Sequence, residues 1–195
     1  MKNHIIISLL ILSIGLSQKE YDINHIVERD GVYIQKFSNE IVNGKVFQKM
    51  YGGVKLTCGE INDGRYDGLW TLWYENGQKK SQGIYKYGES VGLHTLWYEN
   101  GNKKEKGNFK DGRLDGLFTS WYQYGQKSYE INFKYGKLDG LNTHWYENGN
   151  RSFEGDFKND YPVGIHTEWF NNGRKKWEGT EYEWTHWNED GSVKE

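Results

Sequence analysis

The sequence predicts an all-β protein, an elongated antiparallel meander of stacked β-hairpins with one hairpin in each 24-residue repeat. Two series of residues recur at that interval: Gly68, Gly92, Gly116, Gly140 and Gly164, and Trp73, Trp97, Trp121, Trp145 and Trp169. Alanine is absent from the 195 residues and 16% of them are aromatic, which favours strands and turns over helices. Because such units bury apolar surface against their neighbours, we expect function on the surface of the stack.

Residues 1–17 resemble a secretory signal peptide. Lys2 precedes an apolar run of about a dozen residues, which is short for an uncleaved anchor across ~30 Å of hydrocarbon. Gly15 and Ser17 occupy the positions at which a signal peptidase recognises small residues, so we predict cleavage before Gln18. We therefore expect an exported protein, located in the periplasm, in the cell envelope or outside the cell.

The rest of the chain is predicted to divide into four segments: an N-terminal capping hairpin (18–43), a degenerate repeat (44–67), the regular 24-residue repeats (68–179) and a C-terminal capping half-repeat (180–195). The degenerate repeat keeps the glycine spacing but has Lys49 and Met50 in place of the Trp-Tyr pair. Such departures are typical of the terminal units of a stack, which have a neighbour on one side only.

Each repeat is predicted to contain two strands joined by a tight turn. Asn-Gly between two β-rich runs is the strongest short hairpin signal, and the first regular copy has it at Asn76 and Gly77. We predict a three-residue Glu-Asn-Gly loop whose glycine lies in the left-handed region and forms a bulge. That geometry would place Gly83 of the returning strand on the same face as Trp73 and leave room for the tryptophan ring.

Alternate residues of the first strand point to opposite faces of the sheet. One set is nearly constant from copy to copy, and we expect it to form the structural core, because stacking requires the same residues at every step. The alternative is that the tryptophans of this set are ligand platforms. The residues assigned to the core are Leu69, Thr71, Trp73, Trp97, Trp121, Trp145 and Trp169.

The other set changes its chemistry between copies and is expected to be the binding surface. Trp70, His94 and Phe118 occupy the same position in successive repeats. An exposed aromatic patch of this extent exceeds what a solvated face needs. The candidate binding residues are Trp70, Leu72, Tyr74, His94, Leu96, Tyr98, Phe118 and Tyr122.

Neither a metal site nor catalysis is expected. His94, His144 and His166 fall on the variable set. Neighbouring strands lie ~4.8 Å apart, so equivalent positions in adjacent repeats are about 10 Å apart, too far to share one zinc ion. Of these pairs, only His144 and His166 come near the separation at which two histidines could bind one zinc ion. The sequence also lacks a nucleophile motif and a phosphate-binding loop, so we expect a non-enzymatic protein without a cofactor.

The charge balance disfavours a nucleic-acid partner. Without Lys2 the chain carries 24 basic and 27 acidic residues, a net charge of about −3, whereas phosphate binding favours a basic face. A basic column could meet an anionic lipid or polymer, but glutamates alternate with it, which favours weak surface ion pairing. The column contains Lys79, Lys103, Lys127, Arg151 and Lys175.

Residues 67–80, Asp-Gly-Leu-Trp-Thr-Leu-Trp-Tyr-Glu-Asn-Gly-Gln-Lys-Lys, resemble the bacterial variant of the MORN repeat. The likeness extends over residues 44–191, and proteins of this kind are commonly labelled YwqK-family antitoxins of toxin-antitoxin systems. The resemblance implies a β-hairpin stack without a catalytic role, and eukaryotic relatives are associated with membrane phosphoinositides and protein assembly. A weaker resemblance, to the aromatic hairpins that bind choline and glucans on bacterial surfaces, implies a cell-wall polysaccharide as ligand.

These observations favour an exported, non-catalytic MORN-repeat protein that acts as a binding or scaffold surface for a protein or a cell-envelope partner. Two alternatives stay open: an antitoxin-like component of a toxin-antitoxin system, and a cell-wall carbohydrate-binding module. Polysaccharide and anionic lipid are therefore further ligand classes, and the oligomeric state stays open.

Overall fold

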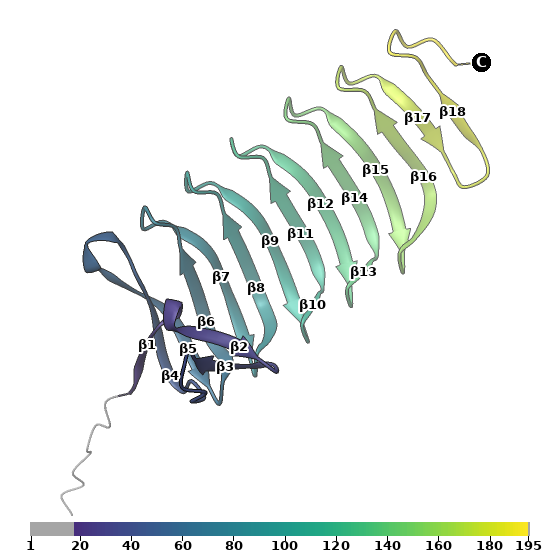
Figure 1. The fold of residues 1–195 in the computed structure, drawn as a ribbon. Coiled ribbons are helices and arrows are strands. Elements are labelled where there is room, and N and C mark those ends of the chain that lie inside the picture. The colour runs from purple at the N-terminus through teal and green to yellow at the C-terminus, as the bar shows by residue number, and fades with distance from the viewer. Residues whose placement is uncertain (1–17, 195) are drawn as a thin grey trace, which may run out of the picture.

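The computed structural model describes residues 18–194, which form one elongated β-sheet with a small hairpin at its N-terminal end (Figure 1). Over these residues the main sheet has 16 strands, and they follow one another in chain order. Neighbouring strands are antiparallel except for the first pair, β1 (Glu20–Asp22) with β4 (Gly44–Lys49), which is parallel. The predicted all-β meander is confirmed.

The N-terminal part holds the elements that differ from the repeats. The strand β5 (Lys55–Asn62) follows β4 in the main sheet, and β2 (Ile26–Arg29) pairs with β3 (Val32–Gln35) in a separate two-stranded hairpin. Two short 3-10 helices, η1 (Ile23–His25) and η2 (Tyr51–Gly53), lie in the connections. Whether the four predicted segments are the natural divisions of the chain stays a prediction, and residues 1–17 lie outside the described residues.

The remaining strands form the repeating stack. They are β6 (Arg65–Trp73), β7 (Lys79–Lys86), β8 (Glu89–Trp97), β9 (Lys103–Lys110), β10 (Arg113–Leu114), β11 (Gly116–Trp121), β12 (Lys127–Lys134), β13 (Lys137–Leu138), β14 (Gly140–Trp145), β15 (Arg151–Lys158), β16 (Tyr161–Trp169), β17 (Lys175–Gly179) and β18 (Trp184–His186). Along the stack in Figure 1, the two strands of a hairpin pair with each other, and each hairpin also pairs with the next one.

The loop between the two strands of a repeat has the predicted geometry. In the first regular copy, the backbone N–H of Tyr74 donates to the carbonyl of Gln78 at 2.8 Å and so closes a three-residue loop over residues 75–77. Gly77 has φ 81°, a conformation that glycine adopts without steric cost. The three-residue loop is confirmed.

A second irregularity lies just beyond this loop, and it changes which side chains share a face. Trp73 pairs with Lys79 but Leu72 pairs with Ser81, so Lys80 has no partner on the opposite strand. An extra residue of this kind moves every later side chain to the other face. Gly83 therefore lies opposite Trp70, and the prediction that it shares a face with Trp73 is wrong.

The face that carries the constant column is only partly a core. Thr71 is buried as predicted and its hydroxyl accepts a hydrogen bond from the Gln82 amide at 3.0 Å. The tryptophans, Trp73 among them, are half-buried. Leu69 is exposed, so the expectation that it belongs to the core is wrong. The described hairpin β2–β3 packs on the opposite side of the sheet and does not cover it. We call the exposed row on this side the leucine face: Leu69 (56% exposed), Leu93 (47%), Leu117 (49%), Leu141 (46%) and Ile165 (65%).

The opposite side, expected to be an exposed variable surface, holds the best-packed part of the molecule. We call it the ring face, made of Trp70, His94, Phe118, Asn142 and His166 together with Tyr85, Phe109, Phe133 and Phe157. Trp70 is 3% exposed and belongs to a core cluster with Val46, Cys58 and Ile61. Burial raises the pKa of the Cys58 thiol to about 11, so this thiol stays protonated at neutral pH.

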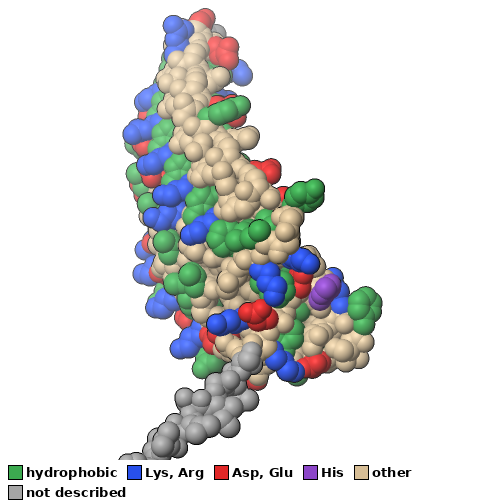
Figure 2. Space-filling view, turned by 90° about the vertical axis from the view of Figure 1, so that its left-hand side faces the viewer, with side chains coloured by type: hydrophobic (Ala, Val, Ile, Leu, Met, Phe, Trp, Pro, Cys, Tyr) green, Lys and Arg blue, Asp and Glu red, His purple; other side chains and the backbone are tan. Residues whose placement is uncertain are grey.

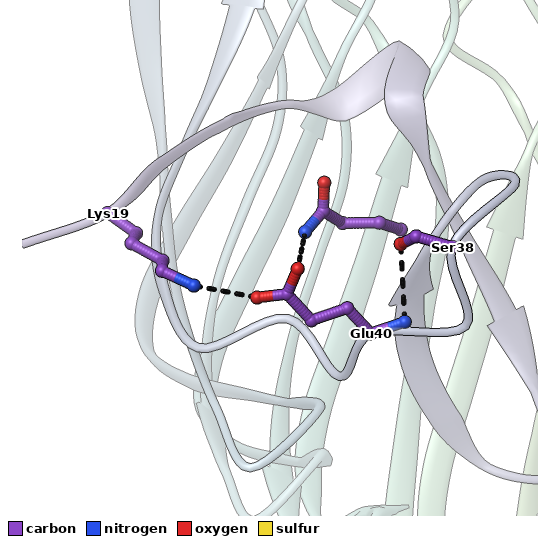
Figure 3. A network of polar contacts seen from close by, with 4 residues as sticks. Lys19, Ser38 and Glu40 are labelled. Carbon is purple, nitrogen blue, oxygen red and sulfur yellow. Dashed lines mark hydrogen bonds and ion pairs between the residues drawn. The ribbon is translucent and has the colours of Figure 1, made fainter.

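A polar network connects the start of the described chain to the segment before β4 (Figure 3). The Glu40 carboxylate accepts hydrogen bonds from Lys19 Nζ at 2.6 Å and from Gln35 Nε2 at 2.7 Å, and the Glu40 N–H donates to Ser38 at 3.3 Å. The hydrogen bond and charge of Lys19 lower the pKa of Glu40, and Glu40 in turn raises the pKa of Lys19. Through Lys19, the network joins the segment before β1 to the hairpin β2–β3.

Candidate functional site

Along the ring face, a large side chain of one repeat lies over a small residue of the preceding strand. A Cβ atom on Gly59 would come within 2.8 Å of the Trp70 ring, and one on Gly155 within 2.7 Å of the His166 ring. The same addition at Gly83 would overlap the ring of His94. The repeated glycine therefore makes room for the variable residue, and not for the constant tryptophan as the sequence suggested.

Hydrogen bonds fix three of these rings in place. Trp70 Nε1 donates to the carbonyl of Glu60 at 2.9 Å, and His94 Nε2 lies 2.9 Å from the carbonyl of Ile84. His166 Nε2 is 2.8 Å from the carbonyl of Asp156. Since a carbonyl only accepts, each imidazole carries its proton on Nε2. Each of these carbonyls belongs to the residue after the small glycine.

One repeat replaces both members of the pair. Ile131 stands where the other copies have glycine, and Asn142 stands where they have a ring. Asn142 is buried, and its side-chain oxygen accepts a hydrogen bond from the backbone N–H of Asn132 at 2.9 Å. The larger residue on one strand is thus offset by a smaller one on the next, as close packing requires.

The structure brings together four of the eight predicted binding residues. Trp70, Leu72, His94 and Leu96 line a cavity of about 140 Å³, together with Tyr66 and Tyr85 among others. The prediction that Trp70 is exposed is wrong, because the N-terminal elements enclose it. Whether these residues bind a ligand stays a prediction.

The other predicted residues lie elsewhere. Phe118 packs further along the ring face against Gly107, and its ring centroid is 6.3 Å from that of Phe133. The tyrosine hydroxyls connect neighbouring repeats instead of facing solvent. At 2.7 Å each, Tyr74 donates to the carbonyl of Trp97, Tyr98 to that of Trp121, Tyr122 to that of Trp145 and Tyr146 to that of Trp169. We call these bonds the tyrosine clasps, and the last regular copy has Phe170 in their place.

A larger cavity of about 520 Å³ lies beside the small one, where the hairpin β2–β3 meets the ring face. Two tyrosines, Tyr66 and Tyr85, line both cavities. The other side chains lining it are Glu28, Tyr33, Arg65, Tyr87 and Glu89. Sequence reasoning missed these residues because the position of the hairpin over the sheet is not encoded in the repeat. The feature of the sequence that points to these cavity residues is the pair of tyrosines Tyr33 and Tyr66, which lie outside the regular repeat pattern.

The tyrosines between the two cavities form a compact group. The rings of Tyr33 and Tyr66 are stacked with centroids 4.5 Å apart, and Tyr85 meets Tyr66 edge-on at 5.3 Å. Burial, followed by a hydrogen bond with Tyr33, raises the pKa of the Tyr66 hydroxyl well above its ordinary value. The Tyr66 hydroxyl is therefore neutral at physiological pH and offers a hydrogen bond rather than a charge.

On the side of the leucine face, the basic column covers the tryptophans of the following repeat. Lys79 Nζ lies 5.8 Å from the centroid of Trp97, and Lys103 Nζ lies 6.0 Å from that of Trp121. Farther along, Lys127 pairs with Glu130 at 2.5 Å. Figure 2 shows basic and hydrophobic side chains alternating along this edge of the stack. The contacts support surface pairing as the role of the column, with a cation–π component.

Within residues 18–194, no group of three or more His, Cys, Asp or Glu side chains is placed to hold a metal ion. The same part of the chain has no helix of the length and apolarity that crossing a membrane requires.

Comparison with known proteins points to the repeat itself. Residues 66–87, 90–111 and 138–159 each match the family described as MORN repeat variant. The repeat between the second and third matches is the one in which Ile131 replaces the small glycine. No curated protein matches the chain. The three matches, set on a stack of β-hairpins, support a MORN-repeat protein.

Proposed function

We propose that the chain is an exported, non-catalytic MORN-repeat protein whose sheet is a binding or scaffold surface for a protein or cell-envelope partner. MORN repeats are generally protein- or membrane-binding modules, which agrees with such a role. The observation that carries the proposal is the leucine face, where five aliphatic side chains lie exposed in equivalent positions. The polar residues Asn108, Asn132 and Asp156 pair with Leu93, Leu117 and Leu141 and separate the members of the row. An exposed aliphatic side chain at the same position of five successive repeats nevertheless supports an interaction surface.

The geometry of the leucine face suits an extended partner. Equivalent side chains of successive repeats lie about 10 Å apart, since each repeat contributes two strands. Two further aliphatic residues are exposed: Ile84 (41%), which pairs with Leu69, and Val163 (44%), which lies on the same strand as Ile165. The lysine column runs beside the row, so a partner with apolar side chains and acidic groups would complement both.

Replacing Leu93 and Leu117 together with serine should abolish partner binding and leave the fold intact. Both side chains are exposed, so the free energy of unfolding should change by less than ~1 kcal/mol. The measurement is quantitative pull-down from native envelope extract with each protein as bait, alongside sedimentation with vesicles of anionic and of neutral lipid. The matched control is Tyr124→Ser, an exposed residue in a turn. Equal recovery of every partner by wild type and by the double variant would refute the proposal.

Export makes a separate prediction about the mature N-terminus. Mass spectrometry of the protein from its native cells should find the chain beginning at Gln18, because signal peptidase recognises Gly15 and Ser17. A chain that retains residues 1–17 in the cytoplasm would instead favour the antitoxin-like role, in which a cognate toxin is the partner. The control is Ser17→Leu, which should block processing at this site.

A further inference from the structure

The larger cavity exists at one end of the stack only, because the N-terminal hairpin forms one of its walls. The hairpin β2–β3 contributes Glu28 and Tyr33, and the first repeats contribute the remaining side chains. Its volume of about 520 Å³ lies within the range of small-molecule sites. The cavity therefore differs from the equivalent positions of the other repeats, and a ligand that binds at one site only would bind here.

Tyr87 supplies an aromatic surface to this cavity. Its side chain is 72% exposed, and its backbone has φ 53°. That left-handed conformation suits the Asp63, Asp111 and Asn159 found at the equivalent turn position, but it is unfavourable for a bulky ring. Tyr135 has the same conformation at the equivalent turn outside the cavity, so the case for Tyr87 rests on its exposed ring and its place in the cavity.

The polar groups around Tyr87 have free hydrogen-bonding capacity. The carboxylates of Glu28 and Glu89 and the guanidinium of Arg65 all line the cavity, yet none of the three forms an ion pair within 4.0 Å with a described residue. The stem of Arg65 lies against Gly88, 3.6 Å from the position of a Cβ there. Lys86 Nζ lies 5.7 Å from the centroid of the Tyr87 ring. The cavity therefore presents both strong acceptors and strong donors beside the exposed ring of Tyr87.

We infer that this cavity binds a neutral saccharide, with one sugar ring stacked on Tyr87. Sugar hydroxyls both donate and accept, so they can satisfy Glu28 or Glu89 and Arg65 at the same time. An organic cation fits less well, because aromatic cages need several free ring faces. Here Tyr66 is covered by Tyr33 on one side and by Trp70, 3.9 Å away, on another, so its ring is not available to a cation.

The test is isothermal titration calorimetry of the full chain with chitotetraose and with maltotetraose, and with choline as the cationic probe. At least one tetrasaccharide should bind, and choline should not. Tyr87→Ala should weaken that binding by about tenfold or more, which corresponds to ~1.4 kcal/mol. Glu28→Gln, on the hairpin, should also weaken it.

The matched control is Tyr135→Ala. Tyr135 occupies the equivalent turn two repeats later, has φ 51° and likewise has a lysine over its ring, Lys110 at 5.4 Å. It lies outside the cavity, so its loss should leave saccharide binding unchanged. Absence of binding by both tetrasaccharides, equal weakening by the two tyrosine variants, or binding of choline alone would each overturn the inference. Because the leucine face is untouched, these outcomes are independent of the pull-down described above.

Discussion

Replacing Trp70 with alanine should lower the free energy of unfolding by about 3–5 kcal/mol, the range for a fully buried large aromatic side chain. The ring is 3% exposed, lies over Gly59, and is 3.9 Å from the centroid of Tyr66. The substitution also leaves the carbonyl of Glu60 without the donor that Trp70 Nε1 supplies at 2.9 Å. Since domains are stable by about 5–15 kcal/mol, this one loss removes much of the total.

Urea unfolding, followed by far-ultraviolet circular dichroism, measures the effect of Trp70→Ala. Trp184→Ala is the matched control, because Trp184 is 62% exposed near the opposite end of the stack and should cost far less. Equal losses for the two variants would contradict the placement of Trp70 in the core. It would then have to be reconsidered as an exposed ligand platform.

The second large effect is expected at Gly83, where isoleucine should destabilise the protein by about 1–3 kcal/mol through overpacking. A Cβ at this position overlaps the ring of His94, which is held by its hydrogen bond to Ile84. Adding His94→Asn should recover stability. The double variant reproduces the pair Ile131 and Asn142 found two repeats later.

A double-mutant cycle checks this compensation. Unfolding free energies of Gly83→Ile, His94→Asn and the double variant should show a coupling of about 1–3 kcal/mol, because the two side chains share one space. His94→Asn alone should also destabilise, since it leaves a void over Gly83. Strictly additive losses would mean that the glycine is retained for its backbone and not for the space above it.

The architecture was predictable from the sequence because its signals are local. The loop at residues 75–77 follows from Asn76 and Gly77, whose backbone preferences suit it. The strand order follows from short connections between adjacent strands. Neither inference requires knowledge of a contact between distant residues.

The assignment of faces failed for two physical reasons. Lys80 forms a second bulge beyond the one predicted at the turn glycine, and it shifts the register by one residue. Nothing in the identity of a lysine signals such a bulge. Constancy between repeats is also a poor guide to burial, since Leu69 in the constant set is exposed and Trp70 in the variable set is buried. Trp70 is enclosed by the N-terminal elements, a contact between segments distant in sequence. The candidate site at Glu28 and Tyr87 depends on the same contact.

The tyrosine clasps give the stack a direction. Each hydroxyl joins its own repeat to the carbonyl of the next one, from Tyr74 to Trp97 and finally from Tyr146 to Trp169. Phe170 has no hydroxyl, so the series stops before the last unit. The last unit is held instead by other contacts, among them the hydrogen bonds of Asn172 and Arg174 to the carbonyl of Glu189. The energetic cost of separating a unit from the sheet therefore depends on which end of the stack it occupies.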